Sequence, residues 1–445
     1  MPETHRTLRL IVRGDERYAE ARRLWNGLLD PRPAAIAECF STSDVVRAVA
    51  IARDRQWTIS VRGGGHGVAG RACRDDALVI DLRMRDVTVD PERLIARAGG
   101  GATWNDFDRA TAAHGLATTG GLISSTGIGG LTLGGGIGWL MRRWGLACDN
   151  LLGAEIVTAD GRVRRVSGTE NGDLFWALRG AGIGLGAVTS LEYALHPVRD
   201  VLAGMVMHSA SRAAEVLRFF RDLCVDAPDA LTALVAFSFA PPAPFVPPEL
   251  RGKPVVVMAV CWSGDLTDGE RIVAPIRTFG PPLADIIGTM RYADLQTMLD
   301  AGAPPHHLNY WKSAFVPSLD EETIDLIVAR GTALPSPLAQ LHVHQLGGAV
   351  ARVSPGSTAF DQRSSPFLVN IPTMWTAPEE TEAMIEWTRD THARIARAAE
   401  TTAYLNFQDR DENPASAWTA ATNDRLRAIK EACDPSRLFG DEPLV

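Results

Sequence analysis

The sequence predicts an α+β protein with two domains, residues 1–197 and 198–400, followed by a C-terminal segment, residues 401–445. Helical and strand-like patterns alternate through the first part, which favours mixed helices and sheets. After Pro197 the loops lengthen, and an antiparallel sheet covered by helices is expected. Of the 41 glycines, 27 lie between Gly63 and Gly186, so the first domain contains segments that need bare backbone.

The first domain opens with a well-marked helix. Ser41 to Asp44 are N-cap residue types, and Val45, Val46, Val49 and Ala50 follow at a spacing that makes one apolar helical face. Asp160-Gly161 predicts a hairpin turn between two strands. The expected elements are strands at 57–61, 77–82, 94–98, 154–158, 162–166 and 187–195, and helices at 103–114 and 171–178.

The second domain has fewer and longer elements. A Pro-rich connection at 241–248 separates its first two strands. Strict alternation places Gln340, His342 and His344 on one face of a strand. The expected elements are helices at 211–224 and from 378 to about 399, and strands at 231–239, 255–261, 338–353 and 367–375.

The composition and charge of the chain argue against several classes of binding partner. Lys+Arg 45 against Asp+Glu 53 gives a net charge of −8, which argues against a nucleic-acid or acidic-membrane surface. No apolar run reaches the roughly 18 residues of a membrane span, and Met1 to Arg6 lead into no secretory signal. The six cysteines are scattered without a C-x-x-C pair, which predicts reduced thiols and a cytoplasmic protein.

Three glycine-rich segments stand out, at 62–70, 127–138 and 180–186. Successive free backbone N–H groups in such loops form anion-binding concavities, so a diphosphate-bearing ligand is expected. Gly65 to Gly70 read G-x-G-x-x-G after a strand, but a polar loop and another strand follow where a Rossmann fingerprint requires a helix. We therefore reject a Rossmann fold. No P-loop string is present either.

The first glycine loop carries a family resemblance. Arg62-Gly63-Gly64-Gly65-His66, with a strand at 78–82, resembles the flavin-attachment segment of the berberine bridge enzyme-like flavoproteins, in the vanillyl-alcohol oxidase and p-cresol methylhydroxylase superfamily. Segments that resemble the same family in the same order lie at 127–139, 145–151, 156–161, 173–180, 310–313, 345–349 and 404–407. The resemblance implies a two-subdomain PCMH-type FAD-binding domain, a substrate domain, and a C-terminal segment that returns to the FAD domain.

FAD is the cofactor that the resemblance implies, covalently bound through His66 to the C8-methyl of the flavin ring. A neutral imidazole is a competent nucleophile near pH 7, which suits this role. Relatives with a second, cysteinyl link carry a cysteine where Ile123 stands, so a single histidyl link is expected, as in bacterial members with one link. The resemblance implies cofactor contacts from Arg62, Gly63, Gly64, Gly65, His66, Gly67, Thr126, Gly127, Gly129, Gly130, Thr132, Gly135, Gly136, Asn150, Val157, Asn406 and Phe407.

The catalytic set of the plant enzymes does not transfer. Their tyrosine and glutamate positions correspond to Val68 and Asn370, and neither side chain deprotonates an alcohol or phenol at neutral pH. The remaining candidates are Asn370 itself, Tyr310, Lys312, His344 and Tyr404, each of which packing alone would also explain. His342 and His344 lack a third readable ligand, so no metal site is expected.

The resemblance implies an oxidoreductase. A C–H bond next to an alcohol or amine of a small organic substrate would give hydride to flavin N5, and O2 would reoxidise the flavin to yield H2O2. Two alternatives stay open: a flavoprotein that binds or reoxidises a reactive metabolite as a resistance or sequestering factor, and a protein with a purely structural flavin. The expected partners are thus a small molecule and O2, with no nucleic acid and no membrane.

Overall fold

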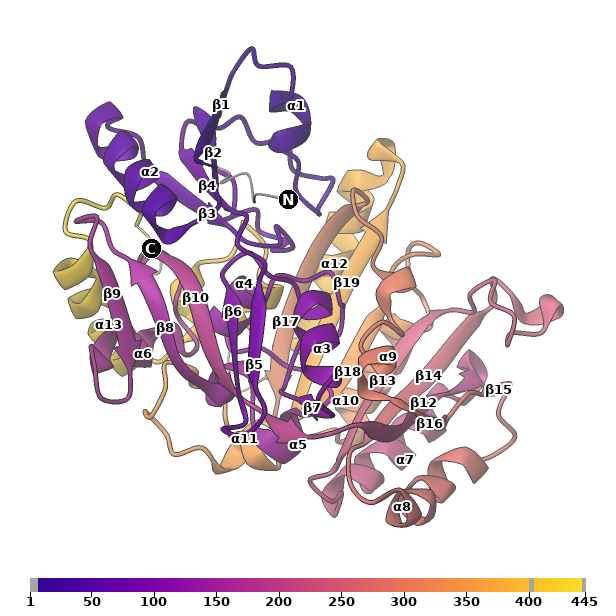
Figure 1. Cartoon of the computed structure of the whole chain (residues 1–445). Coiled ribbons are helices and arrows are strands. Elements are labelled where there is room, and N and C mark those ends of the chain that lie inside the picture. Colours follow the sequence, from indigo (N-terminus) through magenta and orange to yellow (C-terminus); the bar gives the residue numbers. More distant parts are fainter. Residues whose placement is uncertain (1–6, 400–403, 442–445) are drawn as a thin grey trace.

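A computed structural model describes residues 7–399 and 404–441 (Figure 1). Residues 1–6, for which the sequence predicts no secretory signal, lie outside the described residues. Residues 400–403 and 442–445 also lie outside them; these are the last residue of the predicted second domain and two parts of the predicted C-terminal segment. The first sheet has the order β1-β2-β4-β3, with β2, β4 and β3 parallel and β1 antiparallel to β2. Its elements are β1 (Arg9–Val12), α1 (Tyr18–Ala21), β2 (Ala35–Cys39), α2 (Thr42–Arg55), β3 (Ile59–Arg62) and β4 (Leu78–Leu82).

The predicted first helix is confirmed. Ser41 is the N-cap of α2, and its hydroxyl accepts a hydrogen bond from the Asp44 backbone N–H. Val45, Ala48, Val49 and Ala52 of the helix pack on the sheet. Burial of this apolar face fixes the helix against β2 and β4.

A second, antiparallel sheet has the order β5-β6-β10-β8-β9. Val157 pairs with Val163, so the hairpin predicted at Asp160-Gly161 is confirmed. The strands are β5 (Val87–Asp90), β6 (Ile95–Gly99), β8 (Leu151–Val157), β9 (Val163–Ser167) and β10 (Ala187–Ala194); around them lie α3 (Trp104–Ala112), β7 (Leu116–Ala117), α4 (Ile128–Leu133), α5 (Met141–Trp144), η1 (Ala147–Asn150), α6 (Gly172–Leu178) and β11 (His196–Pro197).

The third sheet is antiparallel, with the order β15-β12-β14-β13-β18-β19-β17 and β16 beside β12. Its strands are β12 (Asp200–Ser209), β13 (Leu231–Phe239), β14 (Pro254–Trp262), β15 (Ala284–Asp285), β16 (Gly288–Arg291), β17 (Leu308–Val316), β18 (Leu341–Gln345) and β19 (Phe367–Trp375). Helical segments between or after them are η2 (Ala210–Arg212), α7 (Ala213–Val225), η3 (Pro248–Leu250), α8 (Leu266–Thr278), α9 (Tyr292–Leu295), η4 (Asp300–Gly302), α10 (Glu321–Gly331), α11 (Ala349–Arg352), η5 (Pro378–Glu380) and α12 (Thr381–Ile395). The mixed helix and sheet architecture confirms the α+β class; the domain bounds stay predictions.

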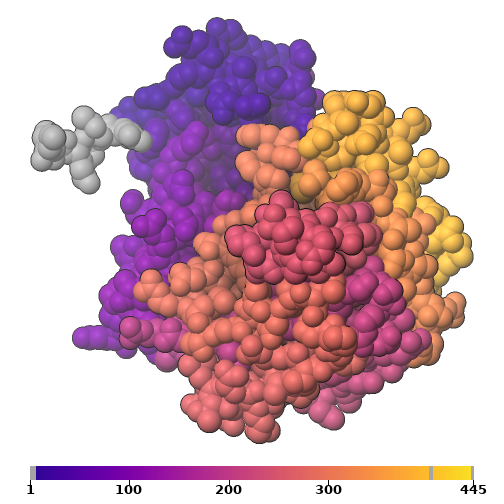
Figure 2. Space-filling model, turned by 90° about the vertical axis from the view of Figure 1, so that its right-hand side faces the viewer, coloured from indigo at the N-terminus to yellow at the C-terminus, as the bar shows by residue number. Residues whose placement is uncertain are grey.

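The two faces of this third sheet have different neighbours. Val235, Val343, Val369 and Ala314 pack in the core beneath the helices α7, α8, α10 and α12. The residues that alternate with them, such as Leu234, pack with Trp139 and other residues of the first domain. We call these the helix face and the first-domain face. Figure 2 shows residues of the second domain, which contains the third sheet, at the centre of one side of the molecule.

Two predictions about elements are wrong. The strand expected at 338–353 is only β18, because Gly347 and Gly348 adopt left-handed backbone (φ +81° and +56°) and turn the chain into α11. The glycine segment at 127–138 is not a continuous loop, because it contains the short helix α4.

After α12 the chain continues through η6 (Leu405–Phe407) and η7 (Pro414–Ala417) to α13 (Ala420–Cys433). Helix α13 packs beside α6 of the first domain (Figure 1), where Leu426 and Ile429 enter that domain's core. The Arg425 guanidinium lies 4.0 Å from the ring centroid of Trp176. The described C-terminal residues therefore return to the first domain. Within the described ranges, no helix is long and apolar enough to span a membrane.

Candidate cofactor and substrate site

The first two glycine segments pack directly against each other. A Cβ at Gly64 would lie 2.4 Å from the Gly127 nitrogen, and a Cβ at Gly127 would lie 2.3 Å from the Gly64 nitrogen. Real Cβ atoms do not approach so closely, so both positions require glycine for loop-to-loop contact. Part of the glycine excess thus builds the fold itself and does not serve a ligand.

The remainder of the first loop is shaped to receive a ligand. No hydrogen bond among the described residues is donated by the backbone N–H of Gly64, Gly65, His66 or Gly67. A Cβ at Gly67 or at Gly130 would meet no atom within 4 Å. Successive free amides that lead to open space at Gly67 suit the oxygen atoms of a flavin nucleotide, so the loop fits FAD.

His66 lies at the centre of this loop. Its Nε2 is 3.0 Å from the Ser125 hydroxyl, and its Nδ1 is 3.5 Å from the Thr126 hydroxyl. Its ring stacks on Trp25, with centroids 5.2 Å apart and planes 18° apart. Burial lowers the pKa of His66 to about 4, so the imidazole is neutral near pH 7. If Ser125 accepts the Nε2 proton, the Nδ1 lone pair is free to react.

Residues of the C-terminal segment hold the second glycine loop. The Tyr404 hydroxyl accepts hydrogen bonds from the Gly136 N–H (2.9 Å) and from the Asn406 amide (2.8 Å). The Asn406 amide also donates to the Leu131 carbonyl. Burial raises the pKa of Tyr404 to about 12, so this tyrosine acts as a hydrogen-bond acceptor and not as a base near neutral pH.

A line of rings connects His66 with the first-domain face of the third sheet. Trp311 lies 5.8 Å from Trp25 and 5.6 Å from Phe407, measured between ring centroids. Phe407 in turn lies 6.2 Å from His344, which neighbours His342 at 5.7 Å. The sheet therefore presents an aromatic surface toward the loop that carries His66.

This surface carries unsatisfied polar groups. His344 and Asn370 are both 2% exposed, and within residues 7–399 and 404–441 neither the His344 Nε2 nor the Asn370 Oδ1 has a hydrogen-bond partner. Asn370 pairs across the strands with His342, whose Nε2 lies 2.6 Å from the Gln340 side-chain oxygen. Burial lowers the pKa of His342 to about 4 and that of His344 to about 3. Unpaired buried polar atoms are costly, and a bound ring or substrate would supply their partners.

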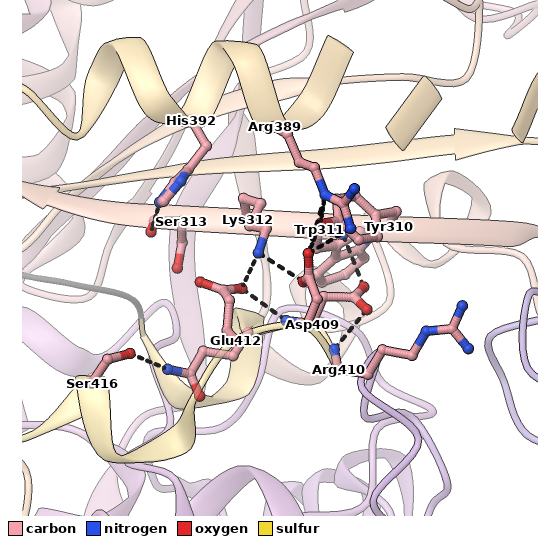
Figure 3. Close-up of polar contacts among 12 residues, drawn as sticks. Tyr310, Trp311, Lys312, Ser313, Arg389, His392, Asp409, Arg410, Glu412 and Ser416 are labelled. Atoms are coloured by element: carbon pink, nitrogen blue, oxygen red, sulfur yellow. Dashed lines mark hydrogen bonds and ion pairs between the residues drawn. The ribbon is translucent and has the colours of Figure 1, made fainter. Parts of the chain in front are cut away.

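Tyr310 and Lys312 lie on the helix face, because they alternate with Trp311 along β17. Figure 3 shows their neighbours on α12 and the C-terminal loop. Tyr310 donates to Asp411 (2.6 Å), and Lys312 forms ion pairs with Asp411 (2.8 Å) and Glu412 (3.2 Å). The structure thus brings His344 and Asn370 toward the His66 loop, and it separates Tyr310 and Lys312 from them.

Several predicted cofactor residues direct their side chains into the protein. Arg62 pairs with Asp81 (2.9 Å), to which it lies opposite in the β3–β4 ladder. The Thr132 hydroxyl bonds to the Tyr193 hydroxyl at 2.7 Å. The Asn150 side-chain oxygen accepts a hydrogen bond from His196, and its amide donates to the Trp144 and Leu146 carbonyls. Among the other predicted cofactor residues, Val157 is a buried strand residue and Gly135 packs on Phe360. Gly63 and Gly129 both lie near the Gly100 carbonyl.

Sequence reasoning missed three residues near His66 or Trp311. Trp25 lies in a segment without a readable motif. Asp300 accepts two hydrogen bonds from Ser124, beside the histidine's hydroxyl partners. Asp409 accepts a hydrogen bond from the Trp311 N–H (3.4 Å), and burial raises its pKa to about 6. Its position two residues after the 404–407 segment was the available signal. Among the described residues, no group of three His, Cys, Asp or Glu could hold a metal ion.

Comparisons with known proteins find two family matches and relatives that span most of the chain. Residues 33–167 match a family described as FAD binding domain, and residues 403–443 match one described as berberine and berberine like. An FAD-linked oxidoreductase of Dictyostelium discoideum is 30% identical over 86% of this chain and 82% of its own. (R)-6-hydroxynicotine oxidase of Paenarthrobacter nicotinovorans is 30% identical over 97% and 94%.

Solved structures show the same architecture. The 6-hydroxy-D-nicotine oxidase of Arthrobacter nicotinovorans superposes with a TM-score of 0.86 at 29% identity, covering 97% of this chain and 96% of its own. A BBE-like protein of Physcomitrella patens superposes with a TM-score of 0.88 at 23% identity, covering 98% and 97%. The overall fold of this chain is therefore shared with these proteins.

Proposed function

The chain belongs to the berberine bridge enzyme-like family of FAD-linked oxidoreductases, and from this premise we propose that it is an oxidase with a single covalent flavin link at His66. Its substrate is a small organic molecule with an oxidisable C–H bond next to an alcohol or amine. The observation that carries the proposal is the neutral His66 ring among four free backbone amides. The similarity to (R)-6-hydroxynicotine oxidase of Paenarthrobacter nicotinovorans supports an oxidase that acts on a small organic molecule.

The protein's part in cofactor attachment is to present a neutral imidazole in a fixed orientation. One ring nitrogen of His66 would hold FAD through a C–N bond to its C8-methyl carbon; His66 would release its ring N–H proton, a methyl proton would leave as well, and O2 would take up the two electrons and two protons as H2O2. The Ser125 and Thr126 hydroxyls, which lie beside the two ring nitrogens, select the tautomer, and the ring proton is released to water. Trp25 fixes the plane of the ring. Ile123 provides no sulfur, which supports a single link.

When bound, FAD supplies the acceptor for the substrate hydride. The protein orients the substrate between this acceptor and the first-domain face of the sheet. That face offers the neutral groups His344, His342 and Asn370 and the rings of Trp311 and Phe407. These groups orient a substrate by hydrogen bonds and stacking and remove no proton at pH 7, which suits a neutral amine or a hydroxyl that releases its proton to water.

The covalent link is tested by flavin fluorescence of denatured protein on a gel. We expect a fluorescent band for the wild type and none for His66→Ala, because alanine has no nucleophilic nitrogen. His114→Ala is a control, since His114 is an exposed histidine after α3 that is not among the implied FAD contacts, and its band should persist. A fluorescent band in His66→Ala would overturn the link.

Oxidase activity is tested by O2 consumption and H2O2 release with a panel of amines, alcohols, sugars and phenols. We expect H2O2 in a one-to-one ratio with oxidised substrate. Substrate oxidation that needs a dye as acceptor would instead make the protein a dehydrogenase. The alternative, a resistance or sequestering factor, predicts a tightly bound compound that is released unchanged.

A further inference from the structure

A segment of the second domain reaches both neighbours of His66. We call residues 296–307, between α9 and β17, the strap. The strap's Asp300 accepts hydrogen bonds from the Ser124 N–H (2.8 Å, to Oδ1) and from the Ser124 hydroxyl (2.6 Å, to Oδ2). Ser124 directly precedes Ser125 and Thr126, the hydroxyl residues beside the His66 ring.

The strap also holds the stacking partner of His66. The Trp25 indole N–H donates to the Ala303 carbonyl (3.2 Å), and the His306 N–H donates to the Trp25 carbonyl (2.7 Å). Next to Trp25, a Cβ at Gly27 would lie 2.2 Å from the His306 carbonyl oxygen, so the two segments are in direct backbone contact. The strap therefore contacts both the Trp25 ring, which stacks on the His66 imidazole, and the loop whose hydroxyls lie at the edge of that imidazole.

The start of the strap is anchored as well. The Gln296 amide donates to the Asp108 carboxyl (2.9 Å) and to the Gly121 carbonyl (3.2 Å). Gln296 is 1% exposed. The loop at 121–126 is therefore held at Gly121 by Gln296 and at Ser124 by Asp300, which limits the freedom of the hydroxyls that follow Ser124.

We propose that the strap positions His66 for attachment to FAD and that Asp300 is the positioning residue of this step. The inference rests on the proposed covalent link. The Asp300 bonds are charge-assisted, so they hold the serine loop more tightly than neutral bonds would. Reaction between two held groups depends steeply on their alignment, so a loosened loop slows attachment even when FAD is bound. The second domain, which carries the substrate face, thereby completes the attachment site of the first.

The test measures attachment of FAD to the full-length apoprotein, as flavin fluorescence of denatured samples over time and at several FAD concentrations. Asp300→Ala should lower the limiting rate at saturating FAD about tenfold. The FAD concentration that gives half the limiting rate should stay unchanged. A role in folding or cofactor binding alone would move that concentration or the melting temperature and leave the limiting rate intact.

Three further variants sharpen the test. Asp300→Asn keeps an oxygen for the Ser124 N–H and an amide beside its hydroxyl but loses the charge, so it should attach FAD faster than Asp300→Ala and more slowly than the wild type. Ser124→Ala removes only the hydrogen bond from the serine hydroxyl and should slow attachment less than Asp300→Ala. If Asp300→Ala does not fold, Ser124→Ala provides the test in its place. Asp294→Ala removes the same charge at an exposed residue whose ion-pair partner is Arg291 (3.8 Å), and it should behave as wild type.

The outcomes separate the inference from the proposed function. Wild-type rates in both Asp300→Ala and Ser124→Ala would overturn the role of the strap alone. Equal slowing in Asp294→Ala would also overturn it, because the effect would then follow from charge and not from contact. A wild-type protein that forms no covalent flavin overturns the link at His66 and, with it, the inference.

Discussion

The Trp25 indole stacks on the His66 imidazole at a centroid distance of 5.2 Å, although the two residues come from segments separated by two strands and a helix. The contact fixes the plane of the imidazole, while the serine loop at its edge fixes the rotation of the ring within that plane. His66 is therefore held in one orientation before any cofactor is attached.

Replacing Trp25 separates stacking from hydrogen bonding. Trp25→Phe keeps a ring against His66 and loses only the bond to Ala303. We expect it to retain most covalent flavin, whereas Trp25→Leu should lose most of it. Flavin fluorescence of the denatured protein, at equal protein load, measures both. Equal flavin content in Trp25→Leu and wild type would show that the stack is dispensable.

The pH dependence of attachment follows from the pKa of His66, which burial lowers to about 4. The imidazole has a free lone pair above this pKa and loses it as the pH falls through 4. Attachment should therefore proceed at a constant rate from pH 6 to pH 8. Stopped time courses at several pH values measure this rate. A rate that halves near pH 6.5, the ordinary value for histidine, would contradict the assigned environment.

His344 is expected to bind substrate. His344→Phe preserves the ring but removes the unpaired Nε2. Covalent flavin should be unchanged, while kcat/KM should fall about tenfold, as expected for one lost hydrogen bond. The variant should be as stable as the wild type or more stable, because a buried unpaired polar atom is gone. Unchanged kcat/KM would remove His344 from the substrate site.

Tyr310 and Lys312 are expected to serve stability. Lys312→Met leaves the Asp411 and Glu412 carboxylates without their ammonium partner, which should lower the free energy of unfolding by about 2–4 kcal/mol. Tyr310→Phe should cost about 1 kcal/mol. Urea unfolding measures both, and kcat of the folded variants should match the wild type. A large loss of kcat at unchanged stability would return these residues to the catalytic candidates.

The buried carboxyl of Asp108 makes stability depend on pH. Burial raises its pKa to about 7, well above the unfolded value, so the folded state holds its proton more tightly. Stability is then lost as pH rises from about 4 to 7. Asp108→Asn should raise the free energy of unfolding at pH 8, by about 2–4 kcal/mol, and change it little at pH 5. Denaturant unfolding at both pH values checks this difference.

Much of the fold is readable from the sequence. The Ser41 cap, the Asp160-Gly161 hairpin and the alternation around His342 act over a few residues, so local preference decides them. The strand predicted at 338–353 failed, because the backbone of Gly347 and Gly348 turns in a way that β propensity does not reveal.

The sequence by itself determined the family, the flavin cofactor and the candidate link at His66, because these depend on residues close together in short motifs. Only the tertiary structure decided that Tyr310 and Lys312 lie on the face of the sheet away from His66, because the side to which each side chain of a strand points depends on what packs on each face of the sheet. It also decided that Trp25 and Asp300 surround His66. These residues lie 41 and 234 positions away from it in the chain, and contacts over such separations are formed by the packing of whole domains, which no local pattern encodes.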